Sequence, residues 1–237
     1  SSPDIQISFN RGIAWQGTGT GGGAVVPAYA VLNTPSRSTV GMIDDLKGQW
    51  REFPASTLRY SDKGTVVEGT RTNLALWCRD WTDAAWVKVT MTTAKTATGI
   101  DGVANAATTI TATGASSTIL QTVVHASSAD AISIFVRRRA GTGTIEVTGD
   151  GVAYTDITTA LAAAASATPG GWYRASVLAT ITNPVIGMRI TTSGDAVDVD
   201  FAQLEVGTFV TSPILTTTVA VARGAEFLTA PMSKLSS

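Results

Sequence analysis

The sequence predicts an all-β protein: a two-sheet antiparallel jelly-roll sandwich preceded by an extended N-terminal arm with short hairpins. From residue 71 onward, short segments rich in Thr, Val, Ile and aromatic residues recur, most of them bounded by Gly, Asp, Asn or Pro. The 237 residues, 44% hydrophobic, suffice for one large domain with an arm. A glycine-rich run at 17–23 interrupts the first part of the chain. We therefore expect an arm over 1–60, the sandwich over 61–226 and a tail over 227–237.

The arm has an uneven composition. Ile5, Ile7 and Phe9 alternate with polar residues, as in a short strand. The run Gly17–Gly23 is typical of a flexible linker; a phosphate cradle is the alternative, but no Lys-Ser/Thr pair follows it. Turn signals between residues 40 and 60, such as Asp-Asp, Lys-Gly and Pro, predict small hairpins there.

Eight further segments have the composition and length of strands. Most of them are bounded by turn-forming residues, and they are spaced as in a sandwich. These segments are Asn73–Trp77, Trp86–Thr92, Ser117–Val124, Ala131–Arg139, Thr144–Thr148, Trp172–Thr182, Pro184–Thr191 and Val197–Leu204.

The alanine-rich stretch Leu161–Ala167 departs from this pattern. Alanine favours helix, but about two turns are marginal for an isolated helix. We interpret the stretch as a strand or strap ahead of a Pro-Gly-Gly turn, with a short helix as the alternative.

The segment from Val197 to Gly207 has the pattern of a strand near the centre of a sheet. Alternation places Val197, Val199, Phe201 and Gln203 on one face, and Asp198, Asp200, Ala202 and Leu204 on the other. Its glycine and the following Pro213 mark the exit from the strand.

Composition narrows the classes of function. Seventeen basic against eighteen acidic residues, a net charge of -1, provide no surplus for phosphate binding, so nucleic acid is not expected as a partner. No run of about eighteen apolar residues and no basic-then-apolar start occurs, so neither membrane insertion nor a signal peptide is expected. The single cysteine, Cys78, excludes an internal disulfide framework and a Cys-rich zinc site, and it is expected to be buried.

Four pieces of the chain occur together in an order that resembles a known group. They are Gly64–Leu74 with its Glu-Gly-Thr-Arg-Thr-Asn-Leu ending, Trp81–Trp86, the Gly-Trp-Tyr-Arg strand at 171–174, and Phe201–Gly207 followed by Thr211–Ile214. Together they resemble bacteriophage and prophage virion proteins whose jelly-roll domain is similar to carbohydrate-binding modules. The resemblance covers about residues 60 to 226, and it departs from the pattern at Pro213, usually Tyr, and at Trp81, usually Phe.

This resemblance implies a tail-fibre, tail-associated or capsid-decorating protein on the surface of the phage particle. It implies other virion proteins as partners, a homo-oligomer with a trimer as one option, and a fold that binds cell-surface glycans in other settings. It does not imply an enzyme. A glycan-binding receptor-recognition domain is the alternative function, and a polysaccharide-degrading enzyme ranks third.

The candidate binding residues lie on the strand 131–139. Phe135, Arg137 and Arg139 share the face opposite the aliphatic residues, where they could contact a glycan or an acidic partner. A solvated surface is the alternative interpretation.

Five of the six tryptophans fall into two groups. Trp81, Trp86 and Trp172 lie inside the motifs of the resemblance, where packing between sheets is expected. Trp15 and Trp50 lie in the N-terminal region and, with Phe9, are the expected assembly residues.

The acidic residues include a candidate metal ligand, but we assign none of them a catalytic role. The resemblance implies a structural calcium near Asp200, since related jelly rolls hold calcium near a carboxylate at the matching strand; solvated aspartates are the alternative. Asp198, Asp200 and Glu205 are the one set of carboxylates that could act as a glycosidase pair. Their spacing along the strand is compatible with both the retaining and the inverting class, so it does not distinguish them. His125 has the position of a strand-end or turn histidine, and we assign no catalytic residue. No other cofactor is expected.

Overall fold

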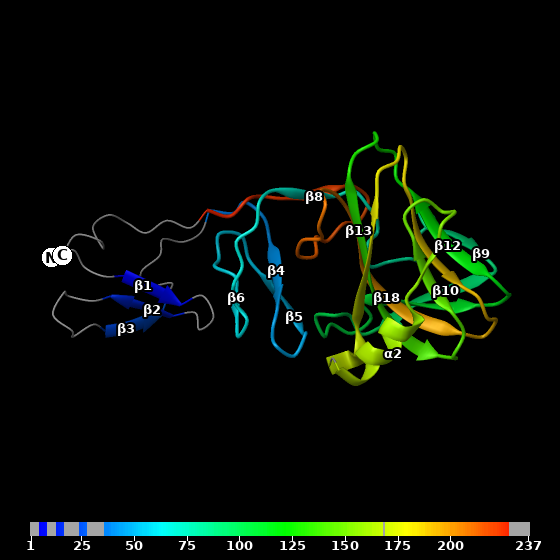
Figure 1. Ribbon diagram of the computed structural model, residues 1–237, viewed down its shortest axis with the longest axis horizontal. Helices are drawn as coiled ribbons and strands as arrows, with labels where there is room; N and C mark the ends of the chain where they lie inside the picture. Colours follow the sequence, from blue (N-terminus) through cyan, green and yellow to red (C-terminus); the bar gives the residue numbers. More distant parts are fainter. Residues whose placement is uncertain (1–4, 9–12, 17–23, 28–35, 168, 228–237) are drawn as a thin grey trace. The chain divides into compact units, whose positions relative to one another are not determined.

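A computed structural model describes residues 5–8, 13–16, 24–27, 36–167 and 169–227 (Figure 1). The chain forms two compact units: a hairpin unit of residues 1–71 and 223–237, and a sandwich unit of residues 72–222. Residues 61–71 and 223–226, which the sequence assigned to the sandwich, have most of their contacts in the hairpin unit. No helix in the described part of the chain is long and apolar enough to span a membrane.

The sandwich unit contains two five-stranded antiparallel sheets, as predicted. In spatial order the first sheet is β10 (Met91–Ala97), β11 (Ala107–Ala112), β18 (Ala196–Val206), β13 (Asp130–Ala140) and β16 (Tyr173–Ala179). The second is β15 (Thr155–Asp156), β14 (Ile145–Thr148), β17 (Val185–Ile190), β12 (Ser117–Thr122) and β9 (Val87–Val89). The inner faces of both sheets bury one aliphatic core.

Two tryptophans fill one part of this core. Trp81 and Trp86 stack with ring centroids 3.8 Å apart and an angle of 10° between planes, and both are fully buried. The core role predicted for them is therefore confirmed. Trp172 is only partly buried and is not a member of the core cluster.

The alanine-rich stretch is a helix, α2 (Thr158–Ala167), so its interpretation as a strand or strap was wrong. Leu161 and Ala164, three positions apart on one face, are buried and anchor the helix. The Asp156 carboxylate accepts a hydrogen bond from the Thr158 amide at the first turn, 2.8 Å away. Tertiary packing thus stabilises a helix too short to persist alone.

Strand β18 contains a bulge that the alternation rule missed. Its register against β13 shifts between the pairs Ser133–Gln203 and Phe135–Asp200, so β18 has one extra residue there, and Phe201 has a positive φ of 40°. Val197 and Val199 face the core as predicted, but beyond the bulge Ala202 and Leu204 face it instead of Gln203. The predicted faces of Phe201 to Leu204 are therefore wrong.

The hairpin unit contains short antiparallel elements, as expected. β1 (Ile5–Ser8), β2 (Ile13–Gln16) and β3 (Ala24–Pro27) form a three-stranded sheet. Two hairpins follow: β4 (Gly41–Asp44) with β5 (Trp50–Phe53), and β6 (Tyr60–Ser61) with β7 (Gly64–Thr65). The chain passes between the units within β8 (Arg71–Asn73) and β19 (Val221–Arg223), which pair with each other.

A buried ionic network inside the hairpin unit joins the segment 37–68 to the returning residues 223–226. Arg37 and Arg59 are fully buried, and both donate hydrogen bonds to the carboxylate of Glu226. Arg59 also pairs with Glu68 at 2.8 Å, and Glu68 pairs with the buried Arg223 at 3.3 Å. Because each guanidinium has a carboxylate partner, the charges can be buried without isolated ions.

Candidate functional site

The predicted binding residues lie on β13, and the structure brings two of them to one carboxylate. Arg137 pairs with Asp198 in the register of β13 and β18, and its guanidinium donates to Asp198 Oδ2 from Nη2 at 2.8 Å and from Nε at 3.1 Å. Arg139 Nη1 lies 3.5 Å from both oxygens of the same carboxylate. Asp198 itself is buried, so it acts as a fixed anchor for both arginines.

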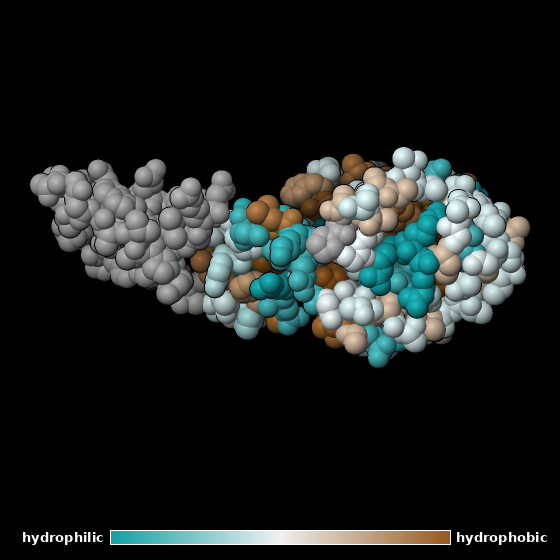
Figure 2. Space-filling model, turned by 90° about the horizontal axis from the view of Figure 1, so that it is seen from below, coloured by the Kyte–Doolittle hydropathy of each residue, from teal (hydrophilic) through white to brown (hydrophobic). Residues whose placement is uncertain are grey.

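Neighbouring strands complete this arrangement. The Thr109 hydroxyl on β11 donates to Asp198 Oδ1 at 2.7 Å. The guanidinium carbon of Arg137 lies 4.6 Å from the ring centroid of Trp172, which directly precedes β16. We call Arg137, Arg139, Trp172 and Asp198 the arginine face. In Figure 2, strongly hydrophilic residues gather in one area of the sandwich unit among weakly polar ones.

The charge of the arginine face is positive, because two guanidinium groups share one carboxylate. The side chain of Arg139 is 53% exposed, while that of Arg137 is only partly exposed. The face can therefore offer planar donors, beside an indole ring, to an anionic group in solution.

Phe135 is not part of this exposed surface. Only 4% of the residue is exposed, and the Arg174 guanidinium covers its ring at 5.0 Å from the centroid while donating to Ser133 Oγ. The predicted exposure of Phe135 is wrong, because the next strand contributes an arginine that lies over the ring.

Asp200, the predicted calcium ligand, lies in a different environment. Its carboxylate accepts hydrogen bonds from Arg79 Nε at 2.8 Å and Nη2 at 3.0 Å, and from the Ile100 amide at 2.9 Å. Burial raises the pKa of Asp200, and the hydrogen bonds from Arg79 partly offset that rise. Asp101 pairs with the same guanidinium. In the described residues no three His, Cys, Asp or Glu side chains group as a metal site; calcium stays a prediction.

The glycosidase-like set does not form one cluster. Asp198 binds Arg137, Asp200 binds Arg79, and the buried Glu205 accepts hydrogen bonds from the Thr211 amide and hydroxyl, both at 2.7 Å. Each carboxylate thus has its own structural partners.

His125 lies just beyond β12, in the predicted position at a strand end, and takes part in a small chain of hydrogen bonds. Its Nε2 lies 2.9 Å from Ser128 Oγ, and that hydroxyl donates to Asp130 Oδ1 at 2.5 Å. In nucleophilic triads the serine donates to the histidine, whereas here its proton points to the aspartate. The arrangement therefore does not activate Ser128 as a nucleophile.

The remaining predicted residues divide between the described and undescribed parts of the chain. Cys78 is buried, as predicted, and burial raises the pKa of its thiol to about 11. Trp50 is partly buried on β5, and Trp15 belongs to β2. Phe9 lies outside the described residues. The assembly role of these three aromatic residues stays a prediction.

We compared the chain with known families, curated proteins and solved structures, and found likeness among the solved structures. No model of a known protein family matches the chain, and no curated protein matches it. Among solved structures, the chain is similar to one from a report on the structural basis for the promiscuous specificity of carbohydrate-binding modules from the β-sandwich superfamily. The two are 12% identical, with a TM-score of 0.41, over 86% of this chain and 84% of that chain.

Proposed function

We propose that the protein is a non-enzymatic structural protein of a bacteriophage virion, which displays its sandwich unit as a binding domain for an acidic cell-surface glycan. The observation that carries the binding role is the pair Arg137 and Arg139 anchored on the buried Asp198. The virion role is supported by the motifs of the resemblance, above all Gln203-Leu-Glu205 with Thr211–Ile214.

An acidic glycan fits the arginine face better than a neutral one. Guanidinium groups form paired hydrogen bonds with carboxylates and sulfates, and the two bonds that Arg137 donates to Asp198 Oδ2 already restrict its rotamers. Trp172 adds an amphipathic ring beside the cations. Since the whole chain has a net charge of -1, the attraction is local to this face.

A direct test measures binding of the full chain to alginate, a polyuronate, with dextran as the neutral control. We expect binding to alginate that weakens with salt and falls roughly 10- to 100-fold in the double variant Arg137→Ala, Arg139→Ala, since each tenfold corresponds to about 1.4 kcal/mol. Arg189→Ala is the matched control, because Arg189 pairs with Glu146 on the other sheet. Equal binding by the double variant and the wild type would refute the site.

Anchoring through the N-terminal region is the second part of the proposal. It assigns assembly to Phe9, Trp15 and Trp50 and expects a homo-oligomer, a trimer being the first to test by light scattering. A truncation should end before Ser36, because Arg37 belongs to the buried ionic network. We expect chains lacking residues 1–35 to fold but to be missing from phage particles in electron micrographs. Normal incorporation would refute the anchor.

The enzyme alternative has its own readout. A polysaccharide-degrading enzyme would release reducing ends from alginate or from host capsule. We expect none, and their release by the wild type but not by an Asp198→Asn variant would overturn the non-enzymatic proposal.

A further inference from the structure

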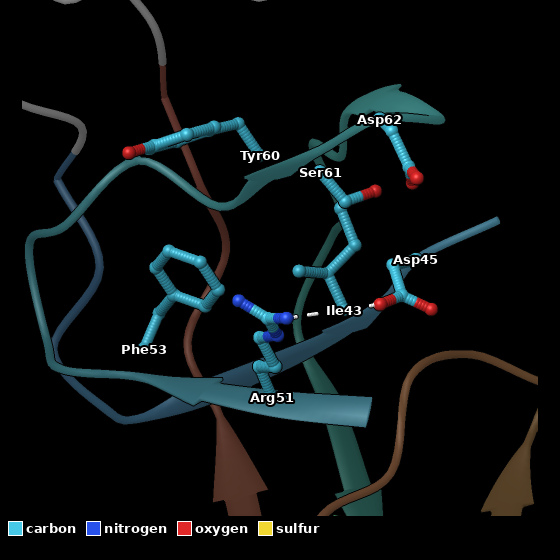
Figure 3. A pocket seen from close by; sticks show the side chains of 7 residues that line it. All are labelled: Ile43, Asp45, Arg51, Phe53, Tyr60, Ser61 and Asp62. Atoms are coloured by element: carbon cyan, nitrogen blue, oxygen red, sulfur yellow. Dashed lines mark ion pairs between the residues drawn. The ribbon is translucent and has the colours of Figure 1, made fainter. Parts of the chain in front are cut away.

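The hairpin unit contains an open pocket that the proposed function does not use (Figure 3). It has a volume of about 460 Å³, within the usual range for small-ligand sites. Alternation along the β4–β5 hairpin places Ile43, Arg51 and Phe53 on the same face, since Ile43 is opposite Arg51 and Phe53 is opposite Gly41. Tyr60 and Asp62, from the β6–β7 hairpin, form the other wall.

One end of the pocket is aromatic. The rings of Phe53 and Tyr60 have centroids 5.9 Å apart and planes inclined by 60°. Tyr60 is 52% exposed, so much of its surface is open to a ligand. Rings at this angle form no parallel slot for a flat nucleobase, but an aromatic ring can pack against the C–H face of a saturated ring.

The other end of the pocket is polar, with charges of both signs. Asp45 and Asp62 each use one carboxylate oxygen to accept a backbone amide, from Gln49 at 2.9 Å and from Leu46 at 2.6 Å. In the part of the chain that the structure describes, Asp62 Oδ2 has no partner. Arg51 pairs with Asp45 Oδ2 at 3.8 Å, and its side chain is 66% exposed.

The geometry points to a binding site for a neutral, hydroxyl-rich ring, the pyranose unit of an uncharged saccharide. The carboxylate oxygens can accept hydrogen bonds and the Arg51 guanidinium can donate them, and a hydroxyl group can pair with either. An anionic ligand would meet two carboxylates, and a cationic ligand would meet Arg51. The aromatic end then packs against the apolar face of the sugar, while the polar end binds its hydroxyls.

This site is separate from the arginine face and goes beyond the proposed function. It lies in the hairpin unit, and its ligand is uncharged, so binding should change little with salt. Binding of a polyanion to the arginine face should instead weaken as the salt concentration rises. Binding at one site can therefore be refuted without refuting binding at the other.

The test uses the full chain and saturation-transfer difference NMR with the methyl glycosides of glucose, galactose, mannose and N-acetylglucosamine. We expect at least one glycoside to show saturation of its ring C–H protons, with intensity that is retained in 0.5 M salt. Tyr60→Ala should reduce that signal at least fivefold, and so should Asp62→Asn, which keeps the acceptor for the Leu46 amide. The double variant Arg137→Ala, Arg139→Ala is the matched control and should keep the full signal.

Thermal unfolding is measured to check that each variant is folded. Because Tyr60 is exposed, we expect no folding defect in Tyr60→Ala. If Tyr60→Ala nevertheless unfolds the hairpin unit, it is replaced by Tyr60→Phe. The decision then rests on Asp62→Asn, which must reduce the saturation signal at least fivefold. Absence of a signal for all four glycosides would overturn the inference, as would a signal that persists in Asp62→Asn. A signal lost in the arginine double variant would also overturn it.

Discussion

Replacing Asp198 by alanine is the sharpest test of how the arginine face is built. The carboxylate is buried between β11 and β13, where it accepts hydrogen bonds from Thr109 and Arg137 and lies close to Arg139. The Asp198→Ala substitution leaves the Thr109 hydroxyl and the Arg137 guanidinium without their acceptor. Arg137 is only partly exposed, so water replaces that acceptor incompletely.

The expected cost follows from these contacts. Hydrogen bonds to a charged group contribute about 1.5 to 3 kcal/mol, and a neutral hydroxyl left without its partner costs about 1 kcal/mol. The contribution of Arg139 is small, because its pair is long and its side chain is exposed. We expect a loss of about 3 kcal/mol in the free energy of unfolding. For a unit of roughly 150 residues this lowers the melting temperature by about 6 to 12 °C.

Differential scanning calorimetry of the full chain measures the effect on the sandwich transition. Glu146→Ala is the comparison, because Glu146 pairs with Arg189 through both carboxylate oxygens and the Arg189 side chain is one-third exposed. A pair of that kind contributes at most about 1 kcal/mol. The reasoning is refuted if both variants shift the transition equally, or if Asp198→Ala shifts it by less than about 2 °C.

Three further predictions concern other charged or reactive groups, two of them buried and one partly buried. Glu226→Gln should destabilise the hairpin unit by about 3 to 5 kcal/mol in urea unfolding, because it leaves Arg37 and Arg59 without their shared carboxylate; a cost under about 1 kcal/mol would contradict the network. Cys78 should react with iodoacetamide only in denaturant, since burial raises the pKa of its thiol to about 11, and mass spectrometry of native protein would reveal the opposite. Burial opposes ionisation of Asp101, but hydrogen bonds from Arg79 outweigh it and lower the pKa below 3.8. The stability that Asp101 contributes is therefore present above about pH 3.8 and is lost as pH falls through the lowered pKa. The free energies of unfolding of the wild type and Asp101→Asn should accordingly converge in acid. A difference that stays constant with pH would exclude this linkage.

Most of the sandwich could be predicted from the sequence, because strand composition and turn residues are local signals. The segments at 117–124, 131–139 and 184–191 match β12, β13 and β17 to within a few residues. β11 was missed: Ala107–Ala112 is rich in Ala and Thr and has a single aliphatic residue, Ile110, at its centre. Its position beside β18 in the sheet is a long-range pairing that composition does not reveal.

The candidate site was only partly predictable, for a related reason. Alternation alone identified Arg137 and Arg139 as neighbours on one face of β13. The carboxylate between them comes from β18, and the tryptophan is the residue just before β16, so both depend on pairing register. The pocket of the hairpin unit was missed because two separate hairpins form it, and neither has a binding motif of its own.

The bulge in β18 explains why the arginine face is confined to one half of the strand. Beyond it, the outward residues are Gln203 and Glu205, which bind the returning segment: Gln203 Oε1 accepts the Ile214 amide at 2.8 Å, and Glu205 accepts Thr211. These are the residues on which the resemblance to virion proteins depends. Their side chains are fully buried and serve the fold, so that motif identifies a scaffold and not a ligand site. Before the bulge, the same outward face carries Asp198, whose partners include the partly exposed Arg137 and the exposed Arg139. Among proteins that share the motif at 203–214, binding specificity should therefore vary with the residues at positions 137, 139 and 198.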